Sequence, residues 1–580
     1  MQRRNVLALS ILPLLLLTSC FNRSSYVDKK VNVYRKPNEV DKQITLRYFS
    51  DQPNVPYIQV QDYFLEFFNT FLFQKIDGKS RTFLLAENYY LGFDSEKQLF
   101  FSKGLMAFNH HPDFIQSNAQ IFLKNTNNEV TTPTEKVVNL KNYSIKIYND
   151  YVPLSFLSKV SGGMSQYDIA YNGKDIYVID YGGQLGTATN PSAYGDEYLS
   201  VLNDNSQVRY EDLAKYNYHE LCFVFDNLRG YTNQLVFGDN NLLSLGLNGL
   251  LERYAPKVKE YLLSSDRANY YEGLNALFCG LFDGGHTGIL GKNFDAFRNA
   301  VNRKSEQTFV DLSSKVEALS KDKTSASASA RDSRRSVFGS VGKNYYKFDT
   351  TTKTAYIGFD GFVVDYNGWD NYYKNSGSIP VETDTYAHVR DKFYKALTDN
   401  AENVVLDLTT NGGGSSHALE GVVGLLNKGK SSFYSNDVFN KYRITENYLI
   451  DVNLDGKYDE IDAQEAEKFN FNIGILTSRY SFSCANLFPS ILKELGYKII
   501  GEQSGGGSCA ISIDSTADGI LYVHSSYLCL SDRTGSSIDS GVPVDFAIEH
   551  PKIGQTLEDY SKFYNFEIVS EYLSSAYNLS

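Results

Sequence analysis

Ser483 stands where a strand, a turn and a helix follow one another, which is a favourable place for a nucleophile. The apolar run Ile473–Leu476 predicts a strand, and apolar residues at spacings of three and four after Ser483 predict a helix. In a helix's first turn, free backbone N–H groups and the positive end of the helix dipole stabilise negative charge on an acyl oxygen. The simpler interpretation is that Ser481 or Ser483 only caps the helix. Catalysis would require partner residues elsewhere in the chain.

A glycine-rich loop supplies a second part of such a site. The segment DLTTNGGG, Asp407–Gly414, follows one predicted strand and opens a predicted helix. Glycine there lets backbone N–H groups face a reacting carbonyl with no side chain in the way, as an oxyanion hole requires. No Lys-Ser/Thr pair closes the loop and no GxGxxG follows, so the pattern disfavours phosphate binding.

A histidine beside two glycines is a possible partner for Ser483. Phe282–Gly288, FDGGHTG, places two glycines directly before His286, and they allow a sharp turn that brings the imidazole close to another segment. Taken alone, a histidine in such a turn is more often structural than catalytic.

Four segments stand in a fixed order: DGGHTG, DLTTNGGG, SFSCAN with GEQSGGG, and SSIDSGVPVD. Together, over roughly residues 210–551, they resemble the tail-specific or C-terminal-processing serine proteases, in the branch related to the tricorn protease core. The resemblance implies a crotonase/ClpP-like mixed sheet with helices and an acyl-enzyme mechanism on polypeptides. It assigns Ser483 as the nucleophile, His286 as the general base and Asp539 as the acid that orients the histidine. The implied oxyanion donors are the backbone N–H groups of Gly413, with Gly412 as the alternative, and of Cys484.

The chain departs from the family pattern at several positions. The lysine of the serine-lysine branch would fall in Gly505–Ser508, where there is none, so the resemblance favours His286 as the base. Asp539 replaces the usual glutamate, and Asn486 stands where the family has glutamate. No PDZ-type sequence is evident, which leaves substrate capture to the N-terminal module.

Two other classes of function remain open on the sequence alone. One is a peptide-binding lipoprotein that keeps the protease-like fold without the chemistry. The other is an esterase or lipase, which the absence of a G-x-S-x-G elbow disfavours.

The elements that must position these residues follow from the texture of the chain. Alternating strands and helices predict an α/β catalytic core over residues 343–555, followed by a tail helix over 556–580. Residues 206–319 have helical periodicity and carry His286. Between these regions the small, polar residues 320–342 predict a linker or mobile loop without a core of its own.

The N-terminal part is predicted to be a mostly β module over residues 43–205. Residues 142–180 resemble the copper-amine-oxidase N-terminal-like module, but no His/Cys cluster accompanies them, so no copper is expected. The pair His110-His111 is interpreted as part of a solvated loop.

The first residues predict export and a lipid anchor. Residues 1–20 combine a basic start, a short apolar core and the ending Leu-Thr-Ser-Cys, which resembles a bacterial lipobox. Cleavage there would leave Cys20 as the lipidated first residue of a membrane-anchored protein outside the cytoplasm. Residues 21–42 are polar and predict a flexible tether.

The composition of the chain limits the classes of partner and cofactor that are expected. The 580 residues are too many for one ordinary domain, and the net charge of −12 with scattered Lys and Arg argues against nucleic acid. Cys222, Cys279, Cys484, Cys509 and Cys529 show no paired spacing and no zinc pattern. We expect mostly buried free thiols, with a bridge between Cys484 and Cys509 left open. Oligomeric state is undetermined, and catalysis needs no cofactor.

One further segment predicts a structural calcium site apart from the chemistry. Residues 451–462, DVNLDGKYDEID, place oxygen side chains at loop positions one, three, five, nine and twelve, with glycine at six. The predicted ligands are Asp451, Asn453, Asp455, Lys457 through its carbonyl, Asp459 and Asp462. The twelfth residue is Asp rather than Glu, as in dockerin-like loops, and the alternative is a solvated acidic turn.

Overall fold

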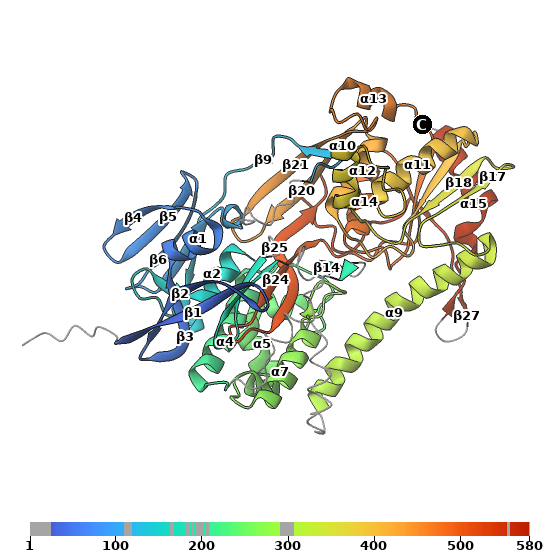
Figure 1. Ribbon diagram of the computed structural model, residues 1–580. Coiled ribbons are helices and arrows are strands. Elements are labelled where there is room, and N and C mark those ends of the chain that lie inside the picture. Colours follow the sequence, from blue (N-terminus) through green and yellow to red (C-terminus); the bar gives the residue numbers. More distant parts are fainter. Residues whose placement is uncertain are drawn as a thin grey trace, which may run out of the picture.

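The computed structural model describes residues 25–109, 119–162, 167–180, 186–187, 190–191, 202, 208–290, 307–553 and 557–578. The predicted signal segment with Cys20 and the pair His110-His111 lie outside these residues. Along the chain, a β-rich module is followed by a helical segment and then by an α/β domain (Figure 1). The mixed α/β fold class predicted from the sequence is confirmed. In the described part of the chain, no helix is both long and apolar enough to cross a membrane.

The N-terminal module contains two sheets. The first has the order β11-β3-β2-β1-β13-β12 and the second the order β10-β7-β6-β5-β4. The strands of the first are β1 (Tyr26–Lys36), β2 (Glu39–Phe49), β3 (Gln52–Gln59), β11 (Tyr151–Pro153), β12 (Tyr167–Tyr171) and β13 (Ile176–Asp180). Those of the second are β4 (Phe73–Asp77), β5 (Ser80–Ala86), β6 (Tyr89–Asp94), β7 (Leu99–Lys103) and β10 (Lys136–Asn139). Short helical turns η1 (Leu105–Phe108) and η2 (Leu140–Tyr143) and the small pair β14 (Gly186–Thr187) and β15 (Asn190–Pro191) complete it.

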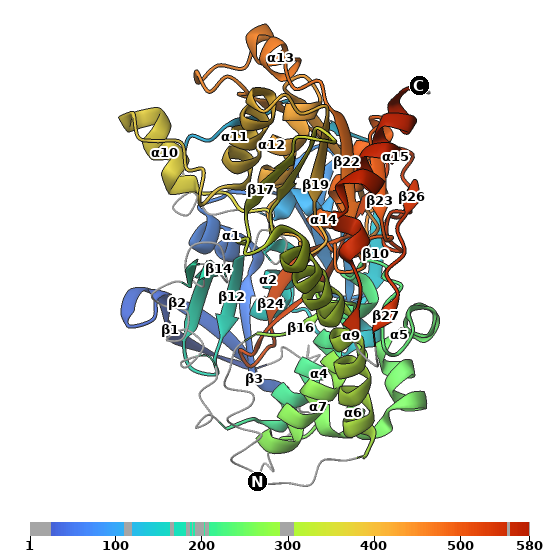
Figure 2. The ribbon, with the colours of Figure 1, turned by 90° about the vertical axis from the view of Figure 1, so that its right-hand side faces the viewer.

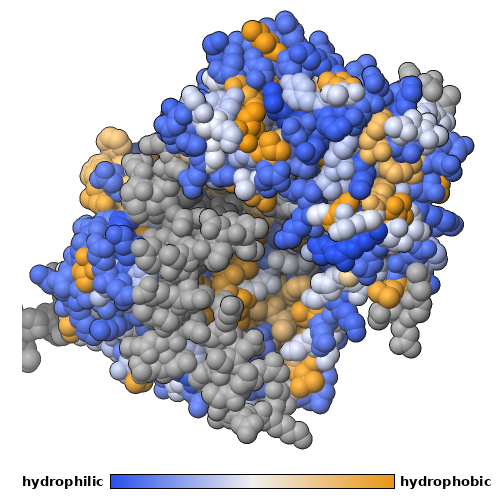
Figure 3. All heavy atoms as spheres, turned by 45° about the vertical axis from the view of Figure 1, so that its right-hand side comes forward, coloured by the Kyte–Doolittle hydropathy of each residue, from blue (hydrophilic) through white to orange (hydrophobic). Residues whose placement is uncertain are grey.

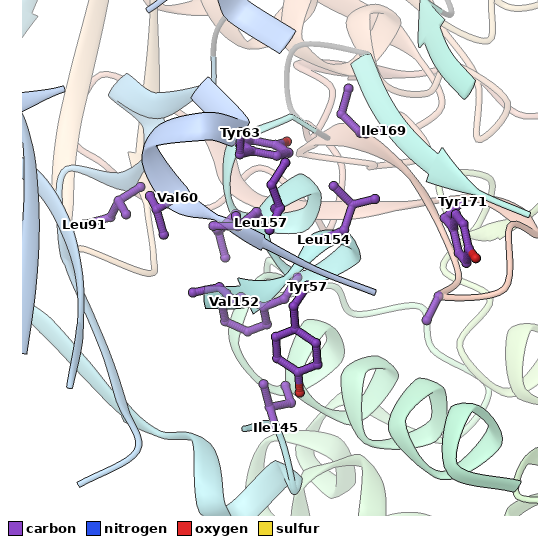
Figure 4. Close-up of a cluster of buried hydrophobic side chains, with 14 of the residues drawn as sticks. Tyr57, Val60, Tyr63, Leu91, Ile145, Val152, Leu154, Leu157, Ile169 and Tyr171 are labelled. Atoms are coloured by element: carbon purple, nitrogen blue, oxygen red, sulfur yellow. The ribbon is translucent and has the colours of Figure 1, made fainter. Parts of the chain in front are cut away.

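Helices α1 (Val60–Phe68) and α2 (Leu154–Ser161) bury apolar faces against this module. Figure 4 shows part of the core that they share with the strands, in which Val60, Leu154 and Leu157 meet Tyr57 and Tyr63.

The predicted tether over residues 21–42 is wrong beyond Ser25. Val31 and Val33 of β1 are buried, and β1 pairs along its length with β2. The apolar alternation in β1 is short and is flanked by charged residues, so it gives only a weak strand signal in the sequence. Pairing with neighbouring strands stabilises the strand.

The helical segment contains α4 (Glu211–Asn227), α5 (Asp239–Tyr254), α6 (Pro256–Leu262) and α7 (Arg267–Gly280). Their apolar faces form one cluster that includes Leu221, Leu250 and Leu277. The loop with His286 begins just after α7.

The predicted linker over residues 320–342 is also wrong, because most of it belongs to the helix α9 (Gln307–Phe338). Ala326 and Ala330 are fully buried, and the N–H groups of Glu558 and Tyr560 donate to the hydroxyls of Ser329 and Ser333. Small side chains let a helix approach its neighbours closely, so a composition typical of a linker here serves packing. In Figure 2, α9 runs between the helical segment and the C-terminal elements.

The α/β domain has a central sheet of order β17-β18-β19-β22-β23-β26, parallel except for β17. Its strands are β17 (Tyr345–Asp349), β18 (Thr354–Gly358), β19 (Asn403–Asp407), β22 (Asn472–Thr477), β23 (Lys498–Gly501) and β26 (Phe546–Ala547). Its helices are α10 (Tyr366–Asn375), α11 (Thr385–Thr398), α12 (Ser416–Leu426), α13 (Glu460–Ala466), α14 (Cys484–Glu494) and α15 (Phe566–Asn578). The C-terminal region also has β27 (Lys552–Ile553), β28 (Leu557–Glu558) and η4 (Ser561–Tyr564).

A second sheet joins all three regions. Its order is β16-β25-β20-β21-β8, with β24 paired to β25 and β9 to β21. The strands are β8 (Leu123–Asn125), β9 (Glu129–Val130), β16 (Gly288–Ile289), β20 (Lys430–Asp437), β21 (Tyr442–Ile450), β24 (Cys509–Ser515) and β25 (Leu521–Ser531). Residues 123–130, which the sequence analysis placed in the N-terminal module, therefore pair with a strand of the α/β domain. On the face shown in Figure 3, the described surface is mostly hydrophilic, and hydrophobic residues are exposed in several separate areas.

Candidate active site

Ser483 is held in a strained turn between β22 and α14. It has φ 56° and ψ −121°, a region that residues other than glycine rarely occupy. Its N–H donates to the carbonyl of Gly506 over 3.0 Å, and its own side chain is partly exposed. The hydroxyls of Ser478 and Ser481 donate to the carbonyls of Thr409 and Leu408, both over 2.7 Å. These bonds fix the turn against the glycine-rich loop.

The glycine-rich loop packs directly on Ser483. A Cβ atom at Gly413 would lie 2.7 Å from the Cβ of Ser483, and Gly413 has φ 110°, so only glycine fits. The N–H of Gly413 donates to Oδ1 of Asn411 over 2.8 Å. This N–H is therefore occupied, and the structure does not support Gly413 as an oxyanion donor.

Two other predicted donors have free N–H groups. Cys484 is the first residue of α14, where a helix has no internal acceptor to offer. Within the described residues, no acceptor is found for the N–H of Cys484 or of Gly412. The Cys484 thiol points elsewhere and donates to the carbonyl of Gly414 over 3.1 Å. An oxyanion at this turn would meet Cys484 N–H at the positive end of the helix.

His286 lies beside the nucleophile turn. Gly284 and Gly285 have φ 90° and 145°, and the His286 N–H donates to Oδ1 of Asp283 over 3.0 Å. The imidazole meets the ring of Phe482 edge-on, with the centroids 4.7 Å apart. Burial lowers the pKa of His286, and the negative charges of Asp283 and Asp539 oppose this effect.

The predicted hydrogen-bond chain from Ser483 through His286 to Asp539 is not formed. Nδ1 of His286 is buried and has no partner among the described residues. The carboxylate of Asp539 instead accepts from the N–H of Asn233 over 2.6 Å, from the N–H of Ser508 over 3.0 Å and from its hydroxyl over 3.2 Å. The structure brings the three residues into one neighbourhood without closing the chain.

Lys323 is a site residue that sequence reasoning missed. It projects from α9, and its ammonium donates to Oε1 of Gln234 over 3.1 Å and lies 4.2 Å from the centre of the Phe482 ring. It also reaches the carbonyls of Gly505 over 3.4 Å and Gly284 over 3.5 Å. Burial lowers its pKa to about 8. The predicted linker hid this residue, because no periodicity marks it.

Asn233 and Ser508, which hold Asp539, were also missed. Ser508 stands in the slot where the serine-lysine branch would have its base, and here it binds the candidate acid instead. Asn233 carries no signal in the sequence.

The thiols agree with the prediction of free, mostly buried cysteines. Cys222, Cys484, Cys509 and Cys529 carry free thiols and are buried, whereas Cys279 is partly exposed. The bridge left open between Cys484 and Cys509 is not present, because Cys509 faces Cys529.

The predicted calcium loop does not gather its carboxylates. Asp451 is fully buried and accepts from the hydroxyl of Tyr373 and the N–H of Gly456, and Asp455 accepts from the N–H and the ammonium of Lys457. Asp459 and Asp462 form the capping box of α13, and the loop contains Asn453. In the described residues, no group of three His, Cys, Asp or Glu side chains is placed to hold a metal ion. The calcium site stays a prediction.

Comparisons with known proteins found a similarity to a peptidase family over part of this site. Residues 354–548 match peptidase family S41. Ser483 and Asp539 lie within the match and His286 lies before it. The search of curated proteins found no match.

Solved structures similar to this chain include a candidate peptidase from Parabacteroides merdae, with 15% identity, a TM-score of 0.32, and coverage of 49% of this chain and 88% of the other. A lipoprotein from Streptococcus agalactiae has 14% identity, a TM-score of 0.31, and coverage of 59% and 92%. The photosystem II D1 C-terminal processing protease has 16% identity, a TM-score of 0.27, and coverage of 40% and 53%. The similarity to peptidase family S41 extends over residues 354–548 of this chain.

Proposed function

We propose that this chain is an exported, lipid-anchored serine endopeptidase that cleaves polypeptides through an acyl-enzyme. The observation that carries the proposal is Ser483 itself. It sits at the N-terminus of α14 in a strained conformation and within a peptidase family S41 match. The free N–H of Cys484 follows it directly, and the loop packed on it contains the free N–H of Gly412. Backbone strain of this kind is characteristic of functional sites.

In the proposed reaction, Ser483 Oγ attacks the scissile carbonyl while His286 accepts its proton. The N–H groups of Cys484 and Gly412 receive the developing oxyanion, and each such donor typically contributes about 3 to 4 kcal/mol to transition-state stabilisation. His286 then gives the proton to the leaving amine, and water hydrolyses the acyl-enzyme by the same route. Asp539 orients the imidazole and stabilises its charged form.

The unpartnered Nδ1 of His286 supports closure of this site on substrate binding. Buried polar atoms are nearly always hydrogen-bonded, and the negative charge of Asp539 acts on this imidazole. Catalytic hydrogen bonds often tighten only when substrate is bound. We infer that a local movement of the His286 and Phe482 rings brings Nδ1 to Asp539 and Nε2 to Ser483.

The same open chain favours a second candidate, a protease-like lipoprotein that binds peptides without cleaving them. A fluorophosphonate probe distinguishes the two. The wild type should be labelled on Ser483, Ser483→Ala should not, and Ser490→Ala in α14 should be labelled like the wild type. Failure to label the wild type across pH 6 to 9, with the protein folded, would favour the binding protein.

Export and anchoring belong to the same proposal and rest on residues 1–20. Cys20→Ser should move the protein from the membrane fraction to the soluble fraction. Ser19→Ala, which keeps the cysteine, should stay in the membrane fraction. Membrane retention of Cys20→Ser would show that the anchor is misassigned.

A further inference from the structure

Cys509 and Cys529 face each other on neighbouring strands. They are direct partners in the register of β24 and β25, both are buried, and their Sγ atoms are 3.5 Å apart (Figure 1 shows the two strands). The N–H of Leu530 donates to the carbonyl of Ser508 over 2.7 Å, which places the two cysteines at a non-hydrogen-bonded position of the ladder. At such positions the Cα atoms are about 4.5 Å apart, within the range of about 4.4 to 6.8 Å that a disulfide spans.

The segment after α4 closes over both sulfurs. A Cβ atom at Gly230 would lie 2.5 Å from Sγ of Cys509 and 2.6 Å from Sγ of Cys529, so a glycine is needed there. The thiol of Cys509 also approaches the carbonyl of Tyr231 at 3.4 Å. The thiol pair is therefore packed against a loop as well as against its own strands.

The same two segments hold the candidate catalytic acid. Ser508, next to Cys509, gives Oδ1 of Asp539 two hydrogen bonds, and Asn233, two residues beyond Tyr231, gives Oδ2 one. Cys509 is thus adjacent in sequence to Ser508, and the loop that covers the thiol pair leads within a few residues to Asn233. A change at the thiol pair would reach both residues that hold Asp539.

We propose that Cys509 and Cys529 form a reversible disulfide that fixes the surroundings of Asp539. Bond formation brings the sulfurs from 3.5 Å to about 2.05 Å and constrains the start of β24, where Ser508 lies. Disulfides are favoured outside the cytoplasm, where the proposed function places this protein. The effect on catalysis rests on that proposed function, whereas formation of the bond does not.

The oxidant is a low-molecular-weight or protein disulfide, for which oxidised glutathione serves as the probe. One cysteine thiolate attacks a sulfur of oxidised glutathione, which forms a mixed disulfide and releases one glutathione. The second thiolate attacks the protein sulfur of that mixed disulfide and releases the other glutathione. The two released glutathione molecules take up the two protons that the cysteines lose. Oxidised glutathione gains the two electrons that the protein loses.

Peptide mass tests the bond directly. No Lys or Arg lies between Lys498 and Arg533, so trypsin releases residues 499–533 as one peptide that contains both cysteines and no others. After equilibration with glutathione, acid quenching and alkylation under denaturing conditions, reduced protein should give a doubly alkylated peptide. Oxidised protein should give an unalkylated peptide two hydrogens lighter than the dithiol, restored by dithiothreitol.

Matched variants complete the test. Cys279→Ser should behave like the wild type, and Cys509→Ser should leave Cys529 open to alkylation in oxidising buffer. Double alkylation of the wild type at every glutathione ratio would overturn the proposal.

A second readout tests the coupling to Asp539. Oxidised wild type should react with the fluorophosphonate probe at least about threefold faster than reduced wild type, and Cys509→Ser should react equally in both buffers. Equal rates for the two wild-type forms, with the disulfide present, would overturn the coupling. No labelling in any form would count against the proposed peptidase, while the peptide mass would still decide whether the bond forms.

Discussion

The imidazole of His286 meets the ring of Phe482 edge-on, with 4.7 Å between the centroids. Phe482 directly precedes Ser483, so the candidate base contacts the residue next to the candidate nucleophile. Phe482 is itself enclosed, since a Cβ atom at Gly507 would lie 2.4 Å from its ring and Lys323 lies above it. Movement of the imidazole toward Ser483 therefore involves Phe482 as well, which couples the base to the turn that it serves.

The pH dependence of labelling should report this buried imidazole. Burial lowers the pKa of His286 below its ordinary 6.5, so the ring stays neutral and able to accept a proton at lower pH. The acid limb of fluorophosphonate labelling should have its midpoint below pH 6.5, and His286→Ala should lower the rate by about 10³-fold or more. A midpoint at or above pH 6.5 would contradict a buried base.

Stability should follow the same titration. The folded-state pKa of His286 is depressed relative to the unfolded chain, so its contribution is present above pH 6.5 and is lost as the pH falls through the folded value. Urea unfolding of wild type and His286→Gln, compared at pH 7.5 and 5.5, should show a larger loss on acidification for the wild type. Parallel losses would contradict this assignment.

Gly413→Ala should disrupt the turn around Ser483. A Cβ atom there meets the Cβ of Ser483 at 2.7 Å and the carbonyl of Phe482 at 2.9 Å, in addition to the strain of φ 110°. We expect labelling to fall at least about 100-fold and unfolding free energy to fall by about 2 to 4 kcal/mol. Gly496→Ala is the matched control, because Gly496 has φ 92° at the other end of α14 and nothing within 4 Å of the added atom. Equal labelling rates for the two variants would refute a specific role for Gly413.

Sequence reasoning located the elements of the candidate site because their signals are local. The strand predicted before the glycine-rich loop and the helix predicted after it correspond to β19 and α12, and the predicted strand, turn and helix around Ser483 correspond to β22 and α14. Apolar periodicity and glycine-rich turns are properties of single segments, and they survive in the folded protein.

Contacts between residues that are distant in the sequence could not be predicted from local patterns. Whether Asp539 reaches His286 depends on Asn233 and Ser508. Even within one loop, whether the N–H of Gly413 is free depends on the side-chain conformation of Asn411, which the residue types do not fix. The helix α9 was missed for a related reason. Its alanines and serines have the composition of a linker. Their role in packing depends on Tyr560 and Phe563, which lie in the same buried cluster and are distant in the sequence.

Thermal unfolding with calcium and with chelator tests the predicted calcium site over residues 451–462. If calcium binds there, chelation should lower the melting temperature of the wild type by several degrees, because a ligand bound only to the folded state stabilises it. Asp455→Ala is the better variant, since its side chain lies in the exposed part of the loop, whereas Asp451 also bonds Tyr373 and Gly456. That variant should melt at the same temperature with calcium and with chelator. A wild type indifferent to chelation would remove the site.

Lys323 should give the activity an alkaline limb. Its ammonium joins Gln234 to the carbonyls of Gly284 and Gly505, and burial lowers its pKa to about 8. The charged groups that act on it are Asp283, Asp539 and Asp322, all of which favour the protonated form. Above pH 8 the amine becomes neutral and its contacts with the two carbonyls weaken, so labelling of Ser483 should decline with a midpoint near pH 8. Lys323→Arg, which keeps its charge, should hold the rate to higher pH, and Lys323→Met should be slower at pH 7 with no decline near pH 8. An unchanged alkaline limb in Lys323→Met would assign that titration to another group.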